Sequence, residues 1–177
     1  MTRRIIRNKK KGILFWITGL SGSGKTSIAK KIKKKITYLY GPTLELSGDN
    51  LRKIFKLNKF SKKARIKYVM NYVHLAKLIT DQKINLIFSV IGMYENARKW
   101  NKKNIDNYVE IYIKSDLSKI LKLKKKTLYL RNKKNIVGLD IKPEFPRKPD
   151  IVINNNFTKT VDNLSKELLN KIKKLNL

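Results

Sequence analysis

Residues 19–26 read Gly-Leu-Ser-Gly-Ser-Gly-Lys-Thr, and they fit the pattern Gly-x-x-x-x-Gly-Lys-Ser/Thr in full. This segment directly follows Ile13–Thr18, a continuous apolar and β-branched run of the kind that forms a buried parallel strand. It also opens Thr26–Ile36, which we expect to be helical. Glycines at these places let successive backbone N–H groups point at phosphate oxygens, and the helix N-terminus adds partial positive charge. The sequence therefore predicts a phosphate-binding loop between a strand and a helix.

The side chains of this loop carry the chemistry expected for ATP and Mg²⁺. Lys25 should reach the β- and γ-phosphates, and the Thr26 hydroxyl should coordinate Mg²⁺. The alternative is a glycine-rich turn followed by an accidental Lys-Thr, and the strand before the loop and the helix after it argue against that alternative. The residues expected to bind ATP are Gly19, Leu20, Ser21, Gly22, Ser23, Gly24, Lys25, Thr26 and Ser27.

Strand-like and helix-like stretches alternate along the rest of the chain. Further strands are expected at Thr43–Ser47, Ile84–Ile91, Tyr108–Ile113 and Asp150–Asn154. Further helices are expected at 61–82 with Ser61 as N-cap, from about residue 95, at 116–122 and through 161–175. Repeated β-α units predict an α/β fold of three layers, that of P-loop NTPases, with a mainly parallel five-stranded sheet. We expect a single domain over residues 1–177, with a basic arm at 1–11 and a short basic lid at about 122–136.

Composition limits the chemistry further. The 177 residues contain 43 Lys and Arg against 12 Asp and Glu, a formal net charge of +31, and 41% are hydrophobic, which is enough for a buried core. The absence of cysteine excludes disulfides, thiolate metal sites and a catalytic cysteine, and His74 is the only histidine. The apolar run after the basic N-terminus is too short to span a membrane. We therefore expect a cytoplasmic protein without a membrane partner.

The positive charge by itself indicates only a partner of negative charge. Nucleic acid and a small polyphosphate both fit, and so does a general excess of lysine without a function. The charge is dense in residues 122–134, which form either a lid that stabilises the γ-phosphate during transfer or a solvated face. The basic residues of this stretch are Lys122, Lys124, Lys125, Lys126, Arg131, Lys133 and Lys134.

The placement of acidic residues indicates which class of P-loop protein this is. Many ATPases and GTPases need a carboxylate after another buried strand to hold Mg²⁺, but Ile84–Ile91 ends in Gly92-Met93. The strand at 43–47 instead delivers Asp49 at its end, with Arg52 close behind. An acid that accepts a hydroxyl proton, beside an arginine that clamps a phosphate, suits a small-molecule kinase. An Asp-Asn helix cap with a surface arginine is the alternative for these residues.

The motifs taken together resemble those of adenylylsulfate kinases. The resemblance runs in order from about Leu14 to Leu175 and covers nearly the whole chain. Its segments are residues 17–25, Gly48-Asp49-Asn50-Leu51-Arg52, Phe60-Ser61 with Arg65, Lys126 with Leu128-Tyr129, Gly138 with Asp140, and Pro149-Asp150-Ile151-Val152-Ile153. Members of this family transfer the γ-phosphate of ATP to the ribose 3′-hydroxyl of adenylyl sulfate with Mg²⁺, and they are commonly dimers. The resemblance implies the same kind of enzyme here, and a homodimer.

The resemblance also implies roles for individual residues. Asp49 would be the catalytic acid/base or would organise Mg²⁺ through water, with Lys25 as the second catalytic residue. Arg52 and Arg65 would hold the anionic end of the acceptor, and Phe60 would stack on its base. The acceptor-binding residues implied are Asp49, Arg52, Phe60, Arg65, Ile91, Gly92, Lys126 and Ile136. Arg98 matches a family arginine whose contact with substrate the sequence leaves open.

Four positions depart from the family pattern. Ser47 replaces the first acid of Leu-Asp-Gly-Asp, Tyr68 replaces an asparagine, Gly92 replaces the serine of Ile-Ser-Pro, and Ile136 replaces the second aromatic ring of the base sandwich. Loss of one ring should weaken purine binding, since base–aromatic stacking contributes roughly 1–3 kcal/mol. Phosphate chemistry is retained, whereas several acceptor contacts are changed.

A branch of the family found with surface-polysaccharide genes shows similar changes. Its pattern around Trp100-Asn101 and Ile136-Val137-Gly138-Leu139-Asp140-Ile141 is closer to this chain than the sulfate-assimilation pattern is. The best-defined activity of that branch is phosphorylation of the 3′-hydroxyl of cytidine diphosphoramidate in capsule modification. The resemblance therefore favours this small nucleotide as the acceptor, with adenylyl sulfate as the alternative.

Other classes remain open on sequence alone. A nucleic-acid-binding protein or polynucleotide kinase would use the +31 charge on a long phosphate backbone, but it should also interleave aromatic residues with the basic ones. Most aromatic residues here lie in expected strands and apolar helix faces, so we expect no specific nucleic-acid partner. Shikimate-type and gluconate-type kinases also bind an acceptor beside a P-loop, but residues 48–52 and 150–153 fit them less well.

Overall fold

A parallel sheet of five strands forms the centre of the computed structural model, which describes residues 10–123, 135–175 and 177. The strands are β1 (Leu14–Thr18), β2 (Thr43–Ser47), β3 (Asn85–Val90), β4 (Tyr108–Lys114) and β5 (Ile151–Asn154). They lie in the order β2-β3-β1-β4-β5, and every neighbouring pair is parallel. Because the strands are parallel, their carboxyl ends meet at one edge of the sheet, which is where ligands bind in folds of this kind.

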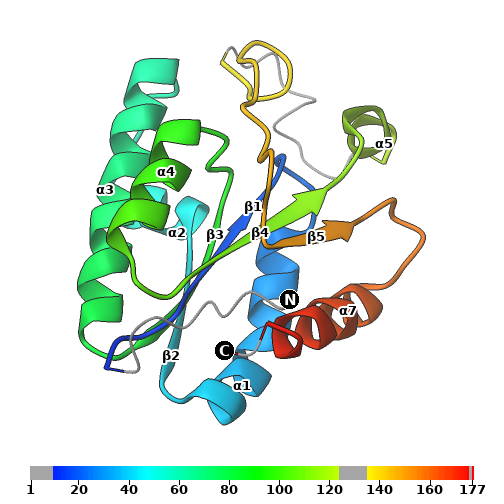
Figure 1. The fold of residues 1–177 in the computed structure, drawn as a ribbon. Helices are drawn as coiled ribbons and strands as arrows, with labels where there is room; N and C mark the ends of the chain where they lie inside the picture. The colour runs from blue at the N-terminus through cyan, green and yellow to red at the C-terminus, as the bar shows by residue number, and fades with distance from the viewer. Residues whose placement is uncertain (1–9, 124–134, 176) are drawn as a thin grey trace.

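Helices cover both faces of the sheet and give the three layers that the sequence predicts (Figure 1). The helices are α1 (Lys25–Tyr40), α2 (Gly48–Ile54), α3 (Lys62–Asp81), α4 (Glu95–Asn104), α5 (Leu117–Lys122) and α7 (Val161–Lys173). In Figure 1, α3 and α4 lie on one side of the sheet, and α1 and α7 lie on the other. The prediction of an α/β, three-layer P-loop fold is confirmed.

The central strand β1 is buried on both faces, which explains its unbroken apolar sequence. Phe15 and Ile17 belong to the apolar cluster under α1 and α7, whereas Leu14 and Trp16 belong to the cluster under α3 and α4. Alternation of side chains along a strand produces these two layers. Trp16 is fully buried and packs edge-on against Phe88 of β3, with ring centroids 5.3 Å apart.

Most predicted elements are observed with ends that differ by one or two residues. The first helix is longer than expected, because it continues four residues beyond Ile36 to Tyr40. Tyr40 packs on Phe15 of the core, and Gly41, with φ 94°, ends the helix. Helix α2 was not predicted as an element, and a helix here was only the alternative interpretation of Asp49 and Asn50 as a helix cap. The Ser47 hydroxyl accepts a hydrogen bond from the Asn50 N–H at 3.2 Å and caps its first turn.

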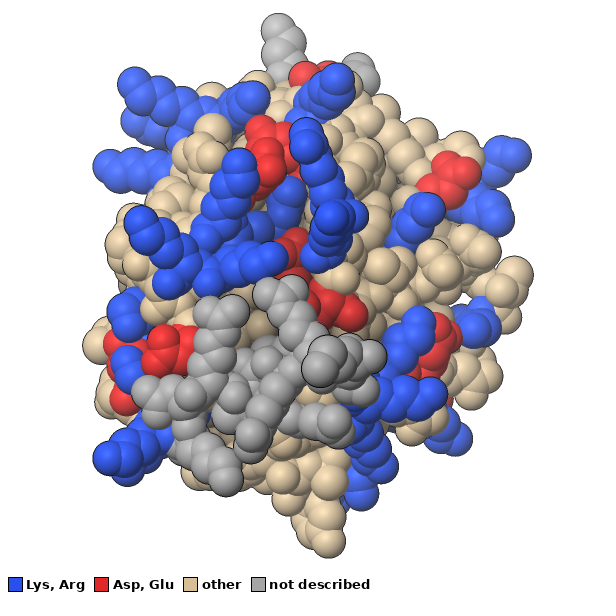
Figure 2. All heavy atoms as spheres, in the orientation of Figure 1, with Lys and Arg blue, Asp and Glu red and all other residues tan. Residues whose placement is uncertain are grey.

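Exposed basic side chains occur on many elements in the described part of the chain. Figure 2 shows Lys and Arg distributed around one face, with fewer Asp and Glu among them. Four predictions concern residues that lie wholly or partly outside the described part of the chain: the arm at 1–11, the lid at about 122–136, the charge within 124–134, and Lys126. No helix among the described residues is long and apolar enough to cross a membrane.

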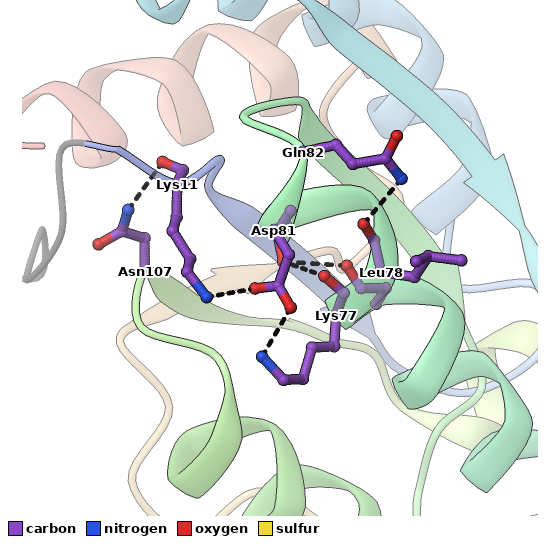
Figure 3. A network of polar contacts seen from close by, with 8 residues as sticks. Lys11, Lys77, Leu78, Asp81, Gln82 and Asn107 are labelled. Carbon is purple, nitrogen blue, oxygen red and sulfur yellow. Dashed lines mark hydrogen bonds and ion pairs between the residues drawn. The ribbon is translucent and has the colours of Figure 1, made fainter.

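The amino end of the sheet is tied to α3 by a small polar network (Figure 3). Lys11 and Lys77 both donate to the Asp81 carboxylate, at 2.6 and 2.8 Å, and the Asn107 amide donates to the Lys11 carbonyl at 3.0 Å. The network joins residues just before β1 to the end of α3 and to the residues just before β4. It lies at the edge of the sheet opposite to the carboxyl ends of the strands.

Candidate active site

A cavity of about 540 Å³ lies at the carboxyl ends of the strands. Its lining comes from the loop after β1, the start of α2, one face of α3, the residues after β3 and the residues after β5. The basic side chains among the described lining residues are Lys25, Arg52, Arg65 and Lys159, and the single acidic one is Asp49. A concave, positively charged site with one carboxylate suits a ligand with several negative charges.

The glycine-rich loop has the geometry expected of a phosphate-binding loop. Gly24 has φ +91°, and a Cβ there would lie 3.2 Å from Asn155 Nδ2, so glycine is required. The Asn155 amide donates to the Ser23 carbonyl at 3.0 Å, which fixes the loop to the residues after β5. The Lys25 ammonium is buried and donates to the Leu20 carbonyl at 2.6 Å, within the loop that precedes Lys25.

The ATP-binding residues predicted from the sequence divide into two groups. Side chains or backbone of residues 21, 22 and 24–27 line the cavity. Gly19, Leu20 and Ser23 are not among the described lining residues; Leu20 packs in an apolar cluster with Met93, and Ser23 is fully buried. Their ATP contacts stay predictions.

Oxygen donors suitable for Mg²⁺ line the same cavity. The Thr26 hydroxyl lies 3.2 Å from the Ser89 hydroxyl at the end of β3, and Asp49 lies in the first turn of α2. No cluster of three or more Asp, Glu, His or Cys is found in the described part of the chain. Mg²⁺ prefers one or two protein oxygens together with waters and substrate phosphates. The donor set around Thr26 and Asp49 therefore fits an ion that is held mainly by a nucleotide.

Asp49 is held at the cavity by the N-terminus of α2. The Ser47 cap starts the helix where the family pattern has an acid, and Asp49 follows two residues later. The Tyr72 hydroxyl of α3 donates to the Gly48 carbonyl at 3.5 Å, next to Asp49. Burial raises the pKa of Tyr72 to about 12, so this phenol stays protonated at neutral pH. Asp49 is the carboxylate among the described residues of this wall, and its catalytic role stays a prediction.

Two arginines lie close to the Phe60 ring. The Arg52 guanidinium lies 4.1 Å from the ring centroid and that of Arg65 lies 5.5 Å from it. Arg65 is buried and donates to the carbonyls of Phe60 and Asn135, at 2.9 and 3.0 Å. Both arginines line the cavity, whereas Phe60 adjoins it without being among the lining residues. Arg65 thereby connects α3 to the first described residue after the gap at 124–134.

The remaining predicted acceptor residues occupy different positions. Ile91 and Gly92, which follow β3, line the cavity. Ile136 is buried and does not line it, but the next residue, Val137, does. The Ile136 N–H donates to the Asp140 carboxylate at 2.8 Å, which holds the turn at 136–141. The acceptor roles of these residues stay predictions, as does that of Lys126.

Sequence reasoning missed the wall of the cavity that follows β5. This wall consists of Asn155, Phe157, Lys159, Val161 and Leu164. The Asn155 side chain also accepts from the Phe157 N–H at 3.0 Å, where Phe157 has φ 64°. A signal was available, because the last parallel strand must end at the same sheet edge as the glycine-rich loop. Ser89, Tyr72 and Tyr94 also line the cavity and were not expected there.

Comparison with known proteins assigns the family. A model of the family described as adenylylsulphate kinase matches residues 11–154, which is more than half of the chain. The chain belongs to the adenylylsulphate kinase family. It is therefore a kinase of the P-loop class, and the resemblance found in the sequence is confirmed.

Two curated relatives of this adenylylsulphate kinase family member differ in their named activities. The cytidine diphosphoramidate kinase of Campylobacter jejuni is 35% identical over 173 residues, which is 96% of this chain and 99% of that protein. A probable adenylyl-sulfate kinase of Pyrococcus abyssi is 31% identical over 93% of this chain and 97% of that protein. The fold matches the APS kinase of Mycobacterium tuberculosis solved in complex with AMPPNP and APS. That match has a TM-score of 0.80 and 24% identity, and it covers 92% of this chain and 98% of that one.

Proposed function

We propose that this kinase transfers the γ-phosphate of ATP to the ribose 3′-hydroxyl of a small nucleotide whose far end is anionic. One observation carries the proposal: the cavity has a phosphate-binding loop on one wall, Arg52 and Arg65 on another, and Asp49 as the single acidic residue among its described lining. A nucleotide donor and an anionic acceptor can both bind there, with the carboxylate available to the reacting hydroxyl.

Each residue has a definite part in this transfer. The loop amides and Lys25 bind the β- and γ-phosphates and orient the γ-phosphate for in-line attack. Asp49 accepts the proton of the acceptor hydroxyl, and Thr26 and Asp49 are the residues that would hold Mg²⁺. The ion supplies charge neutralisation between the phosphates when it is bound. Arg52 and Arg65 hold the anionic end of the acceptor through their forks of N–H donors.

Cytidine diphosphoramidate is the acceptor that we favour, which would place the enzyme in capsule phosphoramidate biosynthesis. The relative with that activity aligns over nearly its full length and is 35% identical. Three of the four changed positions, Ser47, Tyr68 and Gly92, line the cavity, and Ile136 precedes the lining residue Val137. A different base would have to fit against such a changed lining. Adenylyl sulfate is the second candidate, since adenylyl-sulfate kinases are also among the relatives.

A coupled ADP-release assay with Mg-ATP tests both candidates. The chain is compared with cytidine diphosphoramidate, with adenylyl sulfate and without acceptor. Turnover with the cytidine compound alone supports the favoured acceptor, and turnover with adenylyl sulfate alone supports the second. Absence of turnover with both compounds would contradict the proposed function and require a wider acceptor screen.

We further propose that the chain acts as a cytoplasmic homodimer and that residues 1–177 form one kinase domain. The support is the family resemblance, together with the single sheet on which the described helices pack. Light scattering coupled to size-exclusion chromatography measures the assembly directly. A mass of about one chain at micromolar concentration would contradict the dimer.

A further inference from the structure

The turn that follows β3 is held by side chains and backbone from other parts of the chain. The Thr18 hydroxyl donates to the Ile91 carbonyl, and Arg98 Nη1 donates to the Gly92 carbonyl at 3.3 Å. The Glu144 N–H donates to the Met93 carbonyl at 3.0 Å. Three consecutive carbonyls thus have partners from three separate segments. Since Ile91 and Gly92 line the cavity, these contacts define the shape of its wall.

At Gly92 the backbone of this wall lies very close to neighbouring side chains. Its φ is +46°, and a Cβ there would lie 2.6 Å from Val90 Cγ2 and 3.2 Å from Trp16 Nε1. The backbone at Gly92 therefore runs directly against the buried Trp16 in a conformation that side-chain-bearing residues rarely adopt. Such a conformation persists only where the surrounding contacts fix it. The Arg98 hydrogen bond is the contact that holds the Gly92 carbonyl.

A buried carboxylate, that of Glu110, fixes the direction of the Arg98 side chain. Arg98 Nε lies 3.2 Å from Glu110 Oε1, and the two side chains are only 7% and 12% exposed. Glu110 lies beside Trp16 in the register of β1 and β4, within the layer that α3 and α4 cover. A charge in such a layer is retained only with a partner. The pair therefore fixes the direction of the guanidinium as well as its charge.

Further contacts hold Glu110 in place. Its backbone N–H donates to the Asp150 carboxylate at 2.8 Å, and the Tyr108 hydroxyl donates to Glu110 Oε2 at 3.4 Å. The chain of contacts runs from the start of β5 through β4 and α4 to the Gly92 carbonyl. Neither Arg98 nor Glu110 is among the described residues that line the cavity.

We propose that Arg98 and Glu110 are positioning residues for the acceptor, acting through the Gly92 carbonyl rather than by contact with a substrate. The inference rests on the proposed function, because it assumes that the acceptor binds against residues 91–92. Loss of the pair lets the turn shift and misplaces the acceptor hydroxyl. The phosphate-binding loop does not depend on this pair, so it binds ATP as before.

The test measures the KM of the acceptor and the KM of ATP separately, with whichever of cytidine diphosphoramidate and adenylyl sulfate the wild-type chain phosphorylates. Glu110→Gln and Arg98→Met should raise the acceptor KM and lower kcat, so that kcat/KM for the acceptor falls about tenfold or more, since a misplacement of about 1 Å can cost as much as a hundredfold in rate. The KM of ATP should stay within about twofold. Arg98→Lys, which keeps the charge without the planar fork, should give an intermediate acceptor KM.

Lys99→Met is the matched control, because Lys99 is the exposed neighbour of Arg98 and pairs with Glu95 on the same helix. It should leave both KM values unchanged. An unchanged acceptor KM in folded Arg98→Met and Glu110→Gln, or an equal rise in both KM values, would overturn the inference. A rise in Arg98→Met without any rise in Glu110→Gln would also overturn it, because Arg98 would then contact the acceptor itself.

Folding is checked by thermal melting of each variant, and the near-isosteric Glu110→Gln carries the test if Arg98→Met does not fold. Failure of the proposed function gives a different result from failure of this inference. Absence of turnover by the wild-type chain with both acceptors would overturn the proposed function and the inference with it. Normal wild-type turnover with variants that behave like wild type would overturn the inference alone.

Discussion

Lys25 and Asp49 come from different elements and line one cavity. Lys25 begins α1 directly after the glycine-rich loop, and Asp49 lies in the first turn of α2. Each follows a parallel strand, β1 or β2, so the sheet brings both to its carboxyl edge. The proposed chemistry divides between them: Lys25 stabilises the charge of the transferred phosphate, and Asp49 takes the proton.

Lys25→Ala should lower kcat by about three orders of magnitude, because it removes the charge that stabilises the γ-phosphate in transfer. The coupled ADP-release assay measures this. Lys34→Ala is the control, since Lys34 is an exposed lysine on the same helix. A kcat within tenfold of wild type for Lys25→Ala would remove this residue from its proposed role.

Asp49→Asn should abolish turnover to below about 0.1% of wild type while ATP binding is preserved, since the amide cannot accept the hydroxyl proton. Titration of a fluorescent ATP analogue measures binding apart from catalysis. Asp162→Asn is a matched control, because Asp162 is an exposed aspartate paired with Lys31. Near-normal turnover of Asp49→Asn would show that another group takes the proton.

At the scale of elements, the connections at the two ends of the strands have different roles. The turn after β3 is compressed against Trp16 and shapes the cavity, as the close approach at Gly92 shows. The network of Lys11, Lys77 and Asp81 lies at the opposite edge and only joins β1 to α3. Changes at the first connection should affect acceptor binding as well as stability, and changes at the second should affect stability alone.

Gly92→Ser, which introduces the serine of the family pattern, should destabilise the fold by about 1–3 kcal/mol. The side chain would collide with Val90 at a backbone angle that disfavours it. Urea unfolding measures the loss. Gly41→Ser separates the two causes, since Gly41 has φ +94° but no atom within 4 Å of its Cβ position. An equal loss of unfolding free energy in both variants would mean that the residues around Gly92 shift and remove the collision.

Asp81→Asn should reduce the free energy of unfolding at pH 7 by up to about 1 kcal/mol, as expected for an exposed pair. Hydrogen bonds from Lys11 and then Lys77 lower the pKa of Asp81 below its usual 3.8. A carboxylate with a lowered folded-state pKa stabilises the fold above its unfolded pKa and loses that contribution as the pH falls. The difference between wild type and variant should therefore shrink below about pH 4. A pH-independent difference in urea unfolding would refute the ionic explanation.

At the scale of the whole molecule, exposed basic residues in the described part of the chain lie on many elements and not only around the cavity. Figure 2 shows Lys and Arg distributed over one face. The cavity accounts for four basic groups among its described lining residues, and many other Lys and Arg lie elsewhere on the surface. A dispersed charge of this kind attracts any polyanion without selecting one.

DNA binding should therefore be weak, with a Kd in the range of about 10⁻⁴–10⁻⁶ M, and strongly dependent on salt. Filter binding of duplexes of unrelated sequence at 50 and 200 mM salt measures it, and the sequences should not differ. Nanomolar affinity at physiological salt would contradict the interpretation of the surface charge as unselective. It would favour a protein that binds nucleic acid specifically.

The elements show where sequence reasoning succeeds. An unbroken apolar run predicts β1, because burial on both faces demands it, and Ser61 marks the start of α3 because its hydroxyl caps the Ala64 N–H at 3.3 Å. Helix α2 was foreseen only as the alternative for Asp49 and Asn50, because seven residues are too few to show a helical period. The role of Arg98 also escaped it, because its partner Glu110 comes from a different element, the strand β4.

Local patterns in the chain suffice to establish the P-loop, the β-α alternation, the kinase family and Asp49 as a candidate acid. Each depends on residues close together in sequence or on one strand or helix period. Contacts between distant residues depend on how the layers pack, and only the folded structure shows them. The wall after β5, the guanidinium groups around Phe60 and the Arg98–Glu110 support of Gly92 are of this second kind. Their partners are brought together by the parallel sheet, whose strand order no local pattern encodes.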